Sequence, residues 1–164
     1  MALTLRSDSF QDGDYLGTDH ISSEAHGFGC AGGNISPALA WSGAPADTRS
    51  FAVTCFDPDA PTGCGFWHWV LVNLPPDLTS LPAGAGSGEG LPAGALHIRN
   101  DYSTWAYGGP CPPEGDGPHH YVFTLHAVGL DALPVDGDTS AAVVGFNLNF
   151  NTLEKATLTA LYKR

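Results

Sequence analysis

Three stretches of the chain have apolar residues in the arrangement that is typical of buried strands. They are residues 50–56 (SFAVTCF), 66–74 (FWHWVLVNL) and 121–130 (YVFTLHAVGL). The first two carry apolar side chains on both faces, which favours central strands covered on both sides. We therefore predict three core strands, and we expect residues 50–57 and 66–73 to pair as an antiparallel hairpin.

The remaining stretches predict a mostly antiparallel β fold with little helix. Residues 76–118 are too rich in Pro and Gly for continuous sheet or helix. Ser140 is a candidate cap for a helix over 141–150, although the asparagines there are poor helix formers. Residues 157–162 (TLTALY) are typical of a closing strand. Short strands dominate and no βαβ rhythm appears, so the prediction is a mainly β, sandwich-like architecture.

Length and charge narrow the class of protein. A chain of 164 residues with 43% hydrophobic residues fits a single globular domain spanning residues 1–164. Its formal net charge is -11, with 17 acidic residues against 6 basic ones. No basic patch is present to hold a phosphate backbone, so we expect no nucleic-acid partner. A small anionic ligand is compatible with this charge, because local hydrogen-bond donors can outweigh it.

The termini and the cysteines indicate a compartment. No apolar run of 18 residues exists, so we expect no integral membrane segment. The N-terminus lacks the apolar region of a signal peptide, which predicts a cytoplasmic protein. The cysteines Cys30, Cys55, Cys64 and Cys111 are scattered without a CxxC pair. Reduced thiols are therefore the expected state.

Polar residues stand where the predicted hairpin enters the core. Asp57 and His68 lie at the same end of that hairpin. Strand alternation places His68 on an inward face together with Val70 and Val72. Prolines fix the backbone of the connecting loop, so its donors are held ready for a ligand.

A second polar cluster has the same design. The segment YGGPCPPEGDGPHHY, residues 107–121, is a Pro- and Gly-rich loop that leads into a strand. It delivers His119 and Tyr121 to a face shared with Phe123, while His120 falls on the opposite face. Taken singly, each cluster is explained by a core histidine or by turn chemistry. Two of them in one chain favour a shared pocket.

These segments carry a family resemblance. DPDAP (57–61), GFWHW (65–69) and GGPCPPEGDGPHHY (108–121) resemble the two signature regions of the phosphatidylethanolamine-binding proteins. The ending, residues 143–162, resembles the short bacterial branch known as Raf-kinase-inhibitor-like. The resemblance implies a large antiparallel sheet packed on a smaller sheet, with few short helices. It also implies a homodimer and a small pocket at one end of the sheet for phosphate, phosphorylethanolamine or acetate-like groups.

The resemblance also implies a set of ligand-binding residues. They are Asp57, Asp59, Pro61, Phe66, His68, Gly109, Pro110, Cys111, Pro113, His119 and Tyr121. One departure is His120, which stands where the family usually has Arg. Because alternation turns this position away from the pocket, we expect a changed structural salt bridge and no lost ligand contact.

The function we expect is recognition without turnover, with no cofactor and no metal. Imidazoles at His68 and His119 would donate hydrogen bonds to the oxygens of an anion, and Asp57 would orient one of the two rings. A role as a kinase- or protease-inhibitor-like regulator of a protein partner is the main alternative, although no residue identifies such a partner.

Two further alternatives stay open. A hydrolase would combine an Asp and a His with Cys111 or Ser103 as nucleophile, although no G-x-S-x-G motif occurs. A zinc site would use Asp57, Asp59, His68 and His119, although no HxH or HxxxH pair supports it.

The expected homodimer needs apolar surface to offset the repulsion between two chains of charge -11. Trp41, Trp105 and the loop 81–95 carry apolar groups that no predicted strand buries. We expect these groups to form the interface, and we expect added salt to strengthen the dimer.

Overall fold

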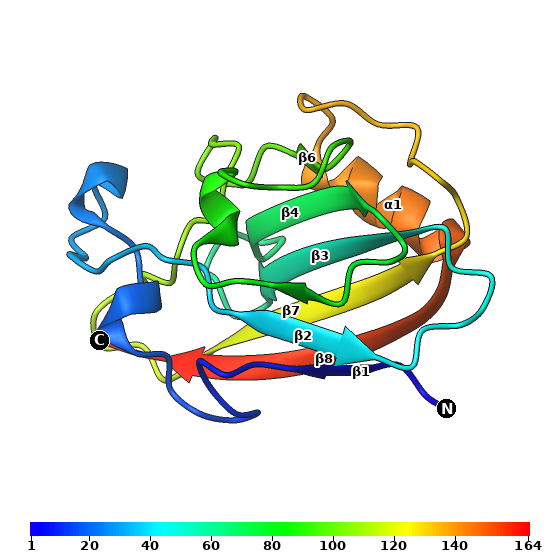
Figure 1. Ribbon diagram of the computed structural model, residues 1–164. Coiled ribbons are helices and arrows are strands. Elements are labelled where there is room, and N and C mark those ends of the chain that lie inside the picture. Colours follow the sequence, from blue (N-terminus) through cyan, green and yellow to red (C-terminus); the bar gives the residue numbers. More distant parts are fainter.

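Two antiparallel sheets pack face to face in the computed structural model, which describes all of residues 1–164 (Figure 1). The large sheet has the strand order β6-β4-β3-β7-β8, and the small sheet has the order β1-β2-β5. The large sheet consists of β3 (Ser50–Asp57), β4 (Phe66–Leu74), β6 (Leu96–His97), β7 (His119–Val128) and β8 (Thr152–Tyr162). The small sheet consists of β1 (Thr4–Arg6), β2 (Leu39–Ser42) and β5 (Ser80–Leu81). The predicted mainly β fold, with a large sheet on a smaller one, is confirmed.

Helix is a minor component, as expected. The one α-helix is α1 (Ala141–Asn151), and three short 3₁₀ turns are η1 (Thr18–His20), η2 (Glu24–His26) and η3 (Ala85–Ser87). The predicted cap is present, because the Ser140 hydroxyl accepts a hydrogen bond of 3.2 Å from the Val143 N–H. None of these helices has the length and apolar character needed to cross a membrane.

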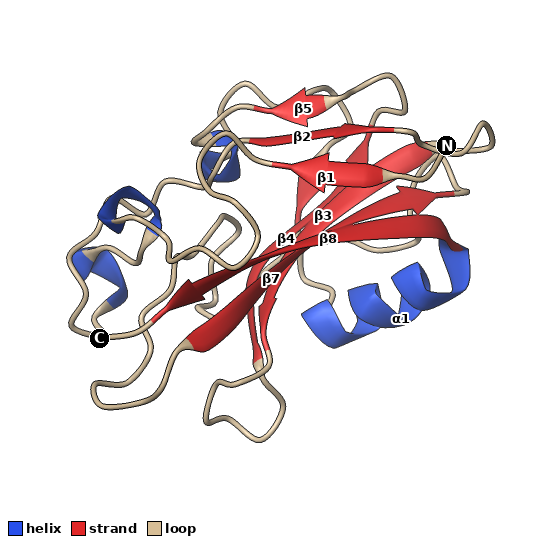
Figure 2. Cartoon of the chain, turned by 90° about the horizontal axis from the view of Figure 1, so that it is seen from below, coloured by secondary structure: helices blue, strands red, loops and turns tan.

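The large sheet separates two apolar cores. Figure 2 shows the small sheet on one of its faces and α1 on the other. The core between the sheets contains 20 buried residues, among them Phe51, Trp69 and Phe123. The core under α1 contains 9 buried residues, among them Val70 and Val144. Burying a large apolar side chain contributes about 1.5–3 kcal/mol, so β3, β4 and β7 are held from both sides.

Trp41 is one of the apolar residues that no predicted strand buries. It lies in β2, is buried, and packs against Phe51 in the core between the sheets, with ring centroids 5.4 Å apart. The expectation that it forms part of an interface is therefore wrong. Trp105 is half exposed, as that expectation required.

A β-bulge interrupts the hairpin of β3 and β4. Cys55 pairs with Trp69, but the next residue of β3 pairs with Trp67, which leaves His68 as the extra residue. A bulge of this kind reorients the side chains that follow it, so strict alternation no longer holds across it.

The bulge corrects the predicted orientation of His68. Val70 and Val72 belong to the core under α1, whereas Tyr121 belongs to the core between the sheets. The His68 ring packs edge-on against Tyr121, with centroids 5.2 Å apart. His68 therefore does not share a face with Val70 and Val72 but points toward the end of the core between the sheets.

Candidate functional site

A cavity of about 180 Å³ lies where β3 ends and β7 begins, at one end of the large sheet. It is lined by Phe28, Asp57, Ala60, Pro61, Thr62, Phe66, His68, Tyr102, Cys111, Pro112, Pro113, His119 and Tyr121. Eight of the predicted site residues are in this set: Asp57, Pro61, Phe66, His68, Cys111, Pro113, His119 and Tyr121. The two polar clusters of the sequence therefore meet at one cavity.

Three predicted site residues lie outside the cavity lining. Asp59 accepts hydrogen bonds of 2.7 Å from the backbone N–H and the Nδ1 of His120. The Gly109 N–H donates to Asn34, and the Pro110 carbonyl accepts from the Ser22 N–H. These three residues therefore make hydrogen bonds within the protein, at loops next to the cavity.

Asp57 and His119 form a buried pair at the centre of the site. β3 and β7 are antiparallel neighbours, so the end of one strand lies beside the start of the other. His119 Nδ1–H donates to Asp57 Oδ2 over 2.7 Å, and both side chains are only 4% exposed. The second oxygen of Asp57 accepts the Asp59 N–H at 2.8 Å. The ring is thus oriented by a carboxylate, as the sequence predicted for one imidazole.

The second ring nitrogen of His119 also meets a carboxylate. Its Nε2–H donates to Asp116 Oδ2 over 2.8 Å, and the Asp116 side chain is 41% exposed. Burial lowers the pKa of His119, but the hydrogen bonds and charges of Asp57 and Asp116 raise it by more, so the net shift is upward. At neutral pH we therefore expect an imidazolium held between two carboxylates.

His68 has the opposite protonation state. Its Nδ1–H donates to the Gly108 carbonyl over 2.7 Å, and the side chain is 3% exposed. Burial lowers the pKa of His68 to about 4, although the backbone carbonyls and Asp57 oppose that shift. The neutral ring keeps its proton on Nδ1, so Nε2 is a hydrogen-bond acceptor with no partner in the protein. The expectation that His68 donates to an anion does not fit this geometry.

Tyr121 adds a free hydroxyl to the same cavity. The residue is 1% exposed, and its hydroxyl makes no hydrogen bond within the protein. Burial raises the pKa of Tyr121, with the nearby Asp57 charge adding to the effect, so the hydroxyl stays protonated. The cavity therefore offers one free donor on Tyr121 and one free acceptor on His68.

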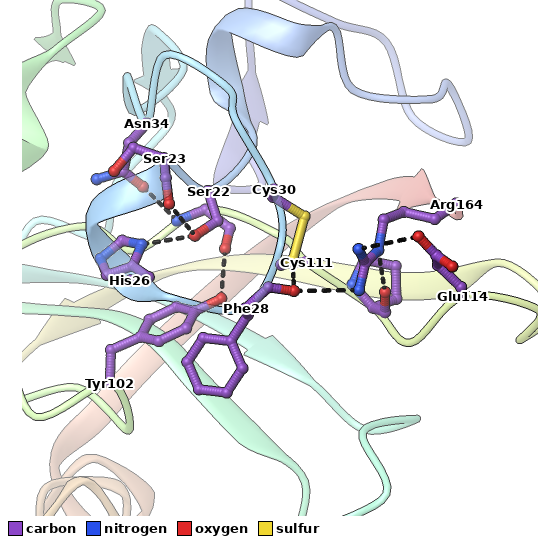
Figure 3. Close-up of a disulfide and its surroundings, with 12 residues drawn as sticks. Ser22, Ser23, His26, Phe28, Cys30, Asn34, Tyr102, Cys111, Glu114 and Arg164 are labelled. Atoms are coloured by element: carbon purple, nitrogen blue, oxygen red, sulfur yellow. Dashed lines mark hydrogen bonds and ion pairs between the residues drawn. A yellow bond between two sulfur atoms is a disulfide. The ribbon is translucent and has the colours of Figure 1, made fainter.

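A disulfide closes one wall of the cavity. Cys30 and Cys111 are bonded, with Cα atoms 5.9 Å apart across a sequence separation of 81 residues (Figure 3). The same wall is tied to the C-terminus, because Arg164 donates hydrogen bonds to the carbonyls of Pro112 and Phe28. The predicted reduced state is wrong for this pair of cysteines, while Cys55 and Cys64 are free thiols.

The structure also places the nucleophiles and zinc ligands that the two remaining alternatives would use. Cys111 has no thiol, and Ser103 is exposed and outside the cavity lining, so neither predicted nucleophile is available there. No group of three or more His, Cys, Asp or Glu side chains is arranged to hold a metal ion. Asp59 in particular binds His120 and does not converge with the other three proposed zinc ligands.

Sequence reasoning missed five lining residues. Ala60 and Pro112 lie inside the quoted motifs and Thr62 directly follows one, so neighbourhood alone could have suggested them. Tyr102 and Phe28 come from loops without a motif. Tyr102 packs against Phe66 with ring centroids 4.8 Å apart, and its hydroxyl donates to the Gly109 carbonyl over 2.7 Å.

Comparisons with known proteins identify relatives of this chain. A family model described as phosphatidylethanolamine-binding protein matches residues 6–163. The UPF0098 protein YbcL of Escherichia coli is 49% identical over 164 residues, which cover 99% of this chain and 88% of that protein. YbhB of the same organism is 48% identical over 161 residues, which cover 98% of this chain and 99% of that protein. A crystal structure of E. coli YbcL superposes with a TM-score of 0.95 at 48% identity, covering 100% of this chain and 99% of that one.

The opposite protonation states of the two rings can be measured directly. At pH 7, long-range ¹H–¹⁵N spectra should show His119 protonated on both nitrogens and His68 protonated on Nδ1 alone. As the pH is lowered, His68 should stay neutral until about pH 4. As the pH is raised, His119 should lose its second ring proton only above the ordinary pKa of 6.5. Signals are assigned with His68→Gln and His119→Gln. A His119 midpoint below that of an exposed histidine would contradict the carboxylate pairing.

The position of His120 supports a second prediction. Its side chain is half exposed, binds Asp59 and lies outside the cavity lining. His120→Arg should therefore change phosphate affinity by less than about twofold, while the exchanged ion pair shifts stability by up to about 1 kcal/mol. Calorimetric titration and thermal unfolding of the same samples test this. A tenfold change in affinity with an unchanged melting temperature would place His120 in the ligand site.

Proposed function

Because the chain belongs to the phosphatidylethanolamine-binding protein family, we propose that its cavity reversibly binds a small oxyanion without turnover. Phosphate and the phosphate group of phosphorylethanolamine are the ligands that we favour. The observation that carries the proposal is a pair of polar atoms without a protein partner, the Tyr121 hydroxyl and His68 Nε2, on two residues that line one cavity.

Polar atoms that line a cavity and have no protein partner favour a ligand. Leaving such an atom unsatisfied costs about 1–3 kcal/mol, so folded proteins normally pair it with protein, water or a bound molecule. Tyr121 supplies a donor and His68 supplies an acceptor. A protonated phosphate oxyanion carries both acceptor oxygens and an O–H donor, so it matches the two atoms together. Phosphorylethanolamine also carries an ammonium donor.

The size of the cavity favours a headgroup over a whole lipid. A volume of about 180 Å³ is well below the roughly 300–1,000 Å³ of pockets for drug-sized ligands. A phosphate or a short phosphoester fits this space, and an acyl chain does not.

The lining favours recognition over hydrolysis. Asp57 and His119 resemble the orienting half of a catalytic triad, but a nucleophile has to lie within hydrogen-bond reach of the base. Cys111 is in a disulfide, and the Thr62 hydroxyl is engaged by the Gly65 carbonyl over 2.6 Å. His119 itself has carboxylates on both nitrogens, so it has no free lone pair with which to accept a proton.

The cytoplasmic location stays a prediction. Disulfides persist mainly in oxidising compartments, so the Cys30–Cys111 bond is an observation that counts against it.

A ligand titration tests the proposed function. Inorganic phosphate and phosphorylethanolamine are added separately to chelator-treated protein while the ring signals of all seven histidines are followed. We expect saturable shifts at His68 and His119. Tyr121→Phe removes only the free hydroxyl, and losing one hydrogen bond to a charged group costs about 1.5–3 kcal/mol. The affinity should therefore fall about ten- to a hundredfold.

Tyr15→Phe is the matched control, because Tyr15 is half exposed and lies outside the cavity lining. It should bind phosphate as the wild type does. Equal, negligible shifts at every histidine would rule out the proposed function. Shifts that appear only without the chelator would show that a bound metal ion is responsible for them.

We also propose that the chain forms a homodimer through α1. Val143, Phe146, Phe150 and Leu153 are exposed, and their spacing places them on one side of the helix and its C-terminal end. The rings of Phe146 and Phe150 pack together with centroids 4.9 Å apart. α1 has no ionisable residue, so two chains of charge -11 meet there with the least repulsion. A two-fold dimer uses one patch twice, which suits a single apolar helix face.

Light scattering tests the dimer. The wild type should show twice the monomer mass, and the association should strengthen as salt rises, because the Debye length falls below about 8 Å above physiological ionic strength. Phe146→Ser with Phe150→Ser should give monomers, and Trp105→Ser should leave the dimer intact. Dissociation by Trp105→Ser alone would place the interface at that loop, and a monomer in both low and high salt would exclude the dimer.

A further inference from the structure

The one cationic side chain of the cavity, His119, already has both of its N–H groups engaged. The lining contains no Lys or Arg, so positive charge has to come from histidine, and His68 is neutral near pH 7. The remaining ring, His119, donates both of its N–H groups to carboxylates, Asp57 at 2.7 Å and Asp116 at 2.8 Å. An incoming oxyanion therefore finds no free imidazole N–H until one carboxylate leaves.

We infer that Asp116 is an intramolecular competitor of the ligand, whose carboxylate holds the His119 Nε2 position that a bound oxyanion takes. This inference rests on the proposed function and adds its regulation: binding exchanges one anion for another at the same imidazolium. We therefore expect the ligand to be a compact oxyanion, either a carboxylate or a phosphate, that can take the place of the Asp116 carboxylate at His119 Nε2.

Asp57 is not the carboxylate that leaves. It is buried at the end of β3, its other oxygen accepts the Asp59 N–H, and the neighbouring strand β7 holds its partner ring. Releasing it would leave a buried charge without a partner, which is strongly destabilising.

Asp116 is built differently, because it lies on an exposed turn. The Asp116 N–H donates to the Pro113 carbonyl over 3.3 Å, and Gly115 has a φ of 88°, which the turn requires of its third residue. Apart from the adjacent residues, no atom lies within 4 Å of the position of a Cβ on Gly115 or Gly117, and both glycines are exposed, so the backbone on either side of Asp116 is open to solvent. The carboxylate can leave His119 and be solvated without disturbing the core.

The only other ion pair of the turn is weak. Glu114 lies 3.6 Å from Arg164 and is mostly exposed, and surface pairs of this kind contribute little. Arg164 is anchored independently through the Pro112 carbonyl, at 2.7 Å. The fixed wall of the cavity therefore ends near Pro112, and the turn that carries Asp116 begins just after it.

Removing the competitor should strengthen binding. Asp116→Ala frees Nε2–H, and we expect the affinity for inorganic phosphate to rise about tenfold, with a smaller rise for Asp116→Asn, whose amide oxygen still accepts a hydrogen bond. Acetate, which reproduces the missing carboxylate, should gain in the same direction.

Glu114→Ala is the matched control. It removes one negative charge from the same turn, but its carboxylate contacts Arg164 and not His119. Its phosphate affinity should equal that of the wild type. This comparison distinguishes direct competition for His119 from a general loss of charge repulsion between the turn and the anion. A second readout uses the backbone amides of Gly115 and Gly117 in the wild type, whose NMR signals should shift on phosphate addition as the turn moves.

The possible outcomes separate the two proposals. Calorimetric titration is carried out at low ionic strength on variants whose melting temperatures match the wild type. Equal or weaker phosphate binding by Asp116→Ala, with saturable binding by the wild type, overturns the competition and leaves the proposed function standing. An equal gain by Glu114→Ala also overturns it. Absence of saturable binding in every variant overturns the proposed function itself.

Discussion

The buried contact between Asp57 and His119 is the constraint around which the end of the large sheet is organised. A carboxylate and an imidazolium removed from water are stable only when they pair with each other and satisfy their remaining hydrogen bonds. Here the strands meet that demand, because β3 ends and β7 begins at the same end of the sheet, where the side chains of Asp57 and His119 reach each other. Removing one partner of such a buried pair typically destabilises the fold by about 3–5 kcal/mol. The pair therefore fixes the point at which the loop after β3 begins and the point at which the loop before β7 ends.

The other features of the site depend on that fixed point. The bulge in β4 brings His68 into the end of the same core, where burial keeps it neutral. Cys111, held by its disulfide, and Tyr102, whose ring packs on Phe66 and His68 of β4, add to the lining. The surroundings thus give the two imidazoles of one cavity different protonation states. Carboxylates favour the charged form of His119, and burial favours the neutral form of His68. Such divergent pairs are typical of sites built to recognise or transform a polar molecule.

The sequence predicts those parts of the site that depend on strand periodicity and on the two motifs. Alternation correctly turned His119 and Tyr121 inward and His120 outward, because β7 pairs regularly over that length. It failed for His68, because a bulge adds a residue that leaves no mark in the apolar pattern. The Cys30–Cys111 bond joins loops 81 residues apart, and only the folded chain brings their Cα atoms to 5.9 Å. Tyr102 and Phe28 reach the cavity through loops whose paths are set by tertiary contacts, so no local signal points to them.

The two histidines also couple the site to pH in opposite directions. The pKa of His119 is raised in the folded state, so its contribution to stability is complete below the unfolded value of 6.5 and is lost as pH rises through the folded value. The pKa of His68 is lowered to about 4, so stability is retained above 6.5 and is lost as pH falls toward that value. Folding therefore favours, near neutral pH, the one state in which the cavity holds a cation beside a neutral acceptor. That state suits a ligand with both oxyanion character and a proton to donate, and Asp116 supplies only the first of these. A protonated phosphate would bring both, and this is the physical reason for proposing it as the ligand that displaces Asp116.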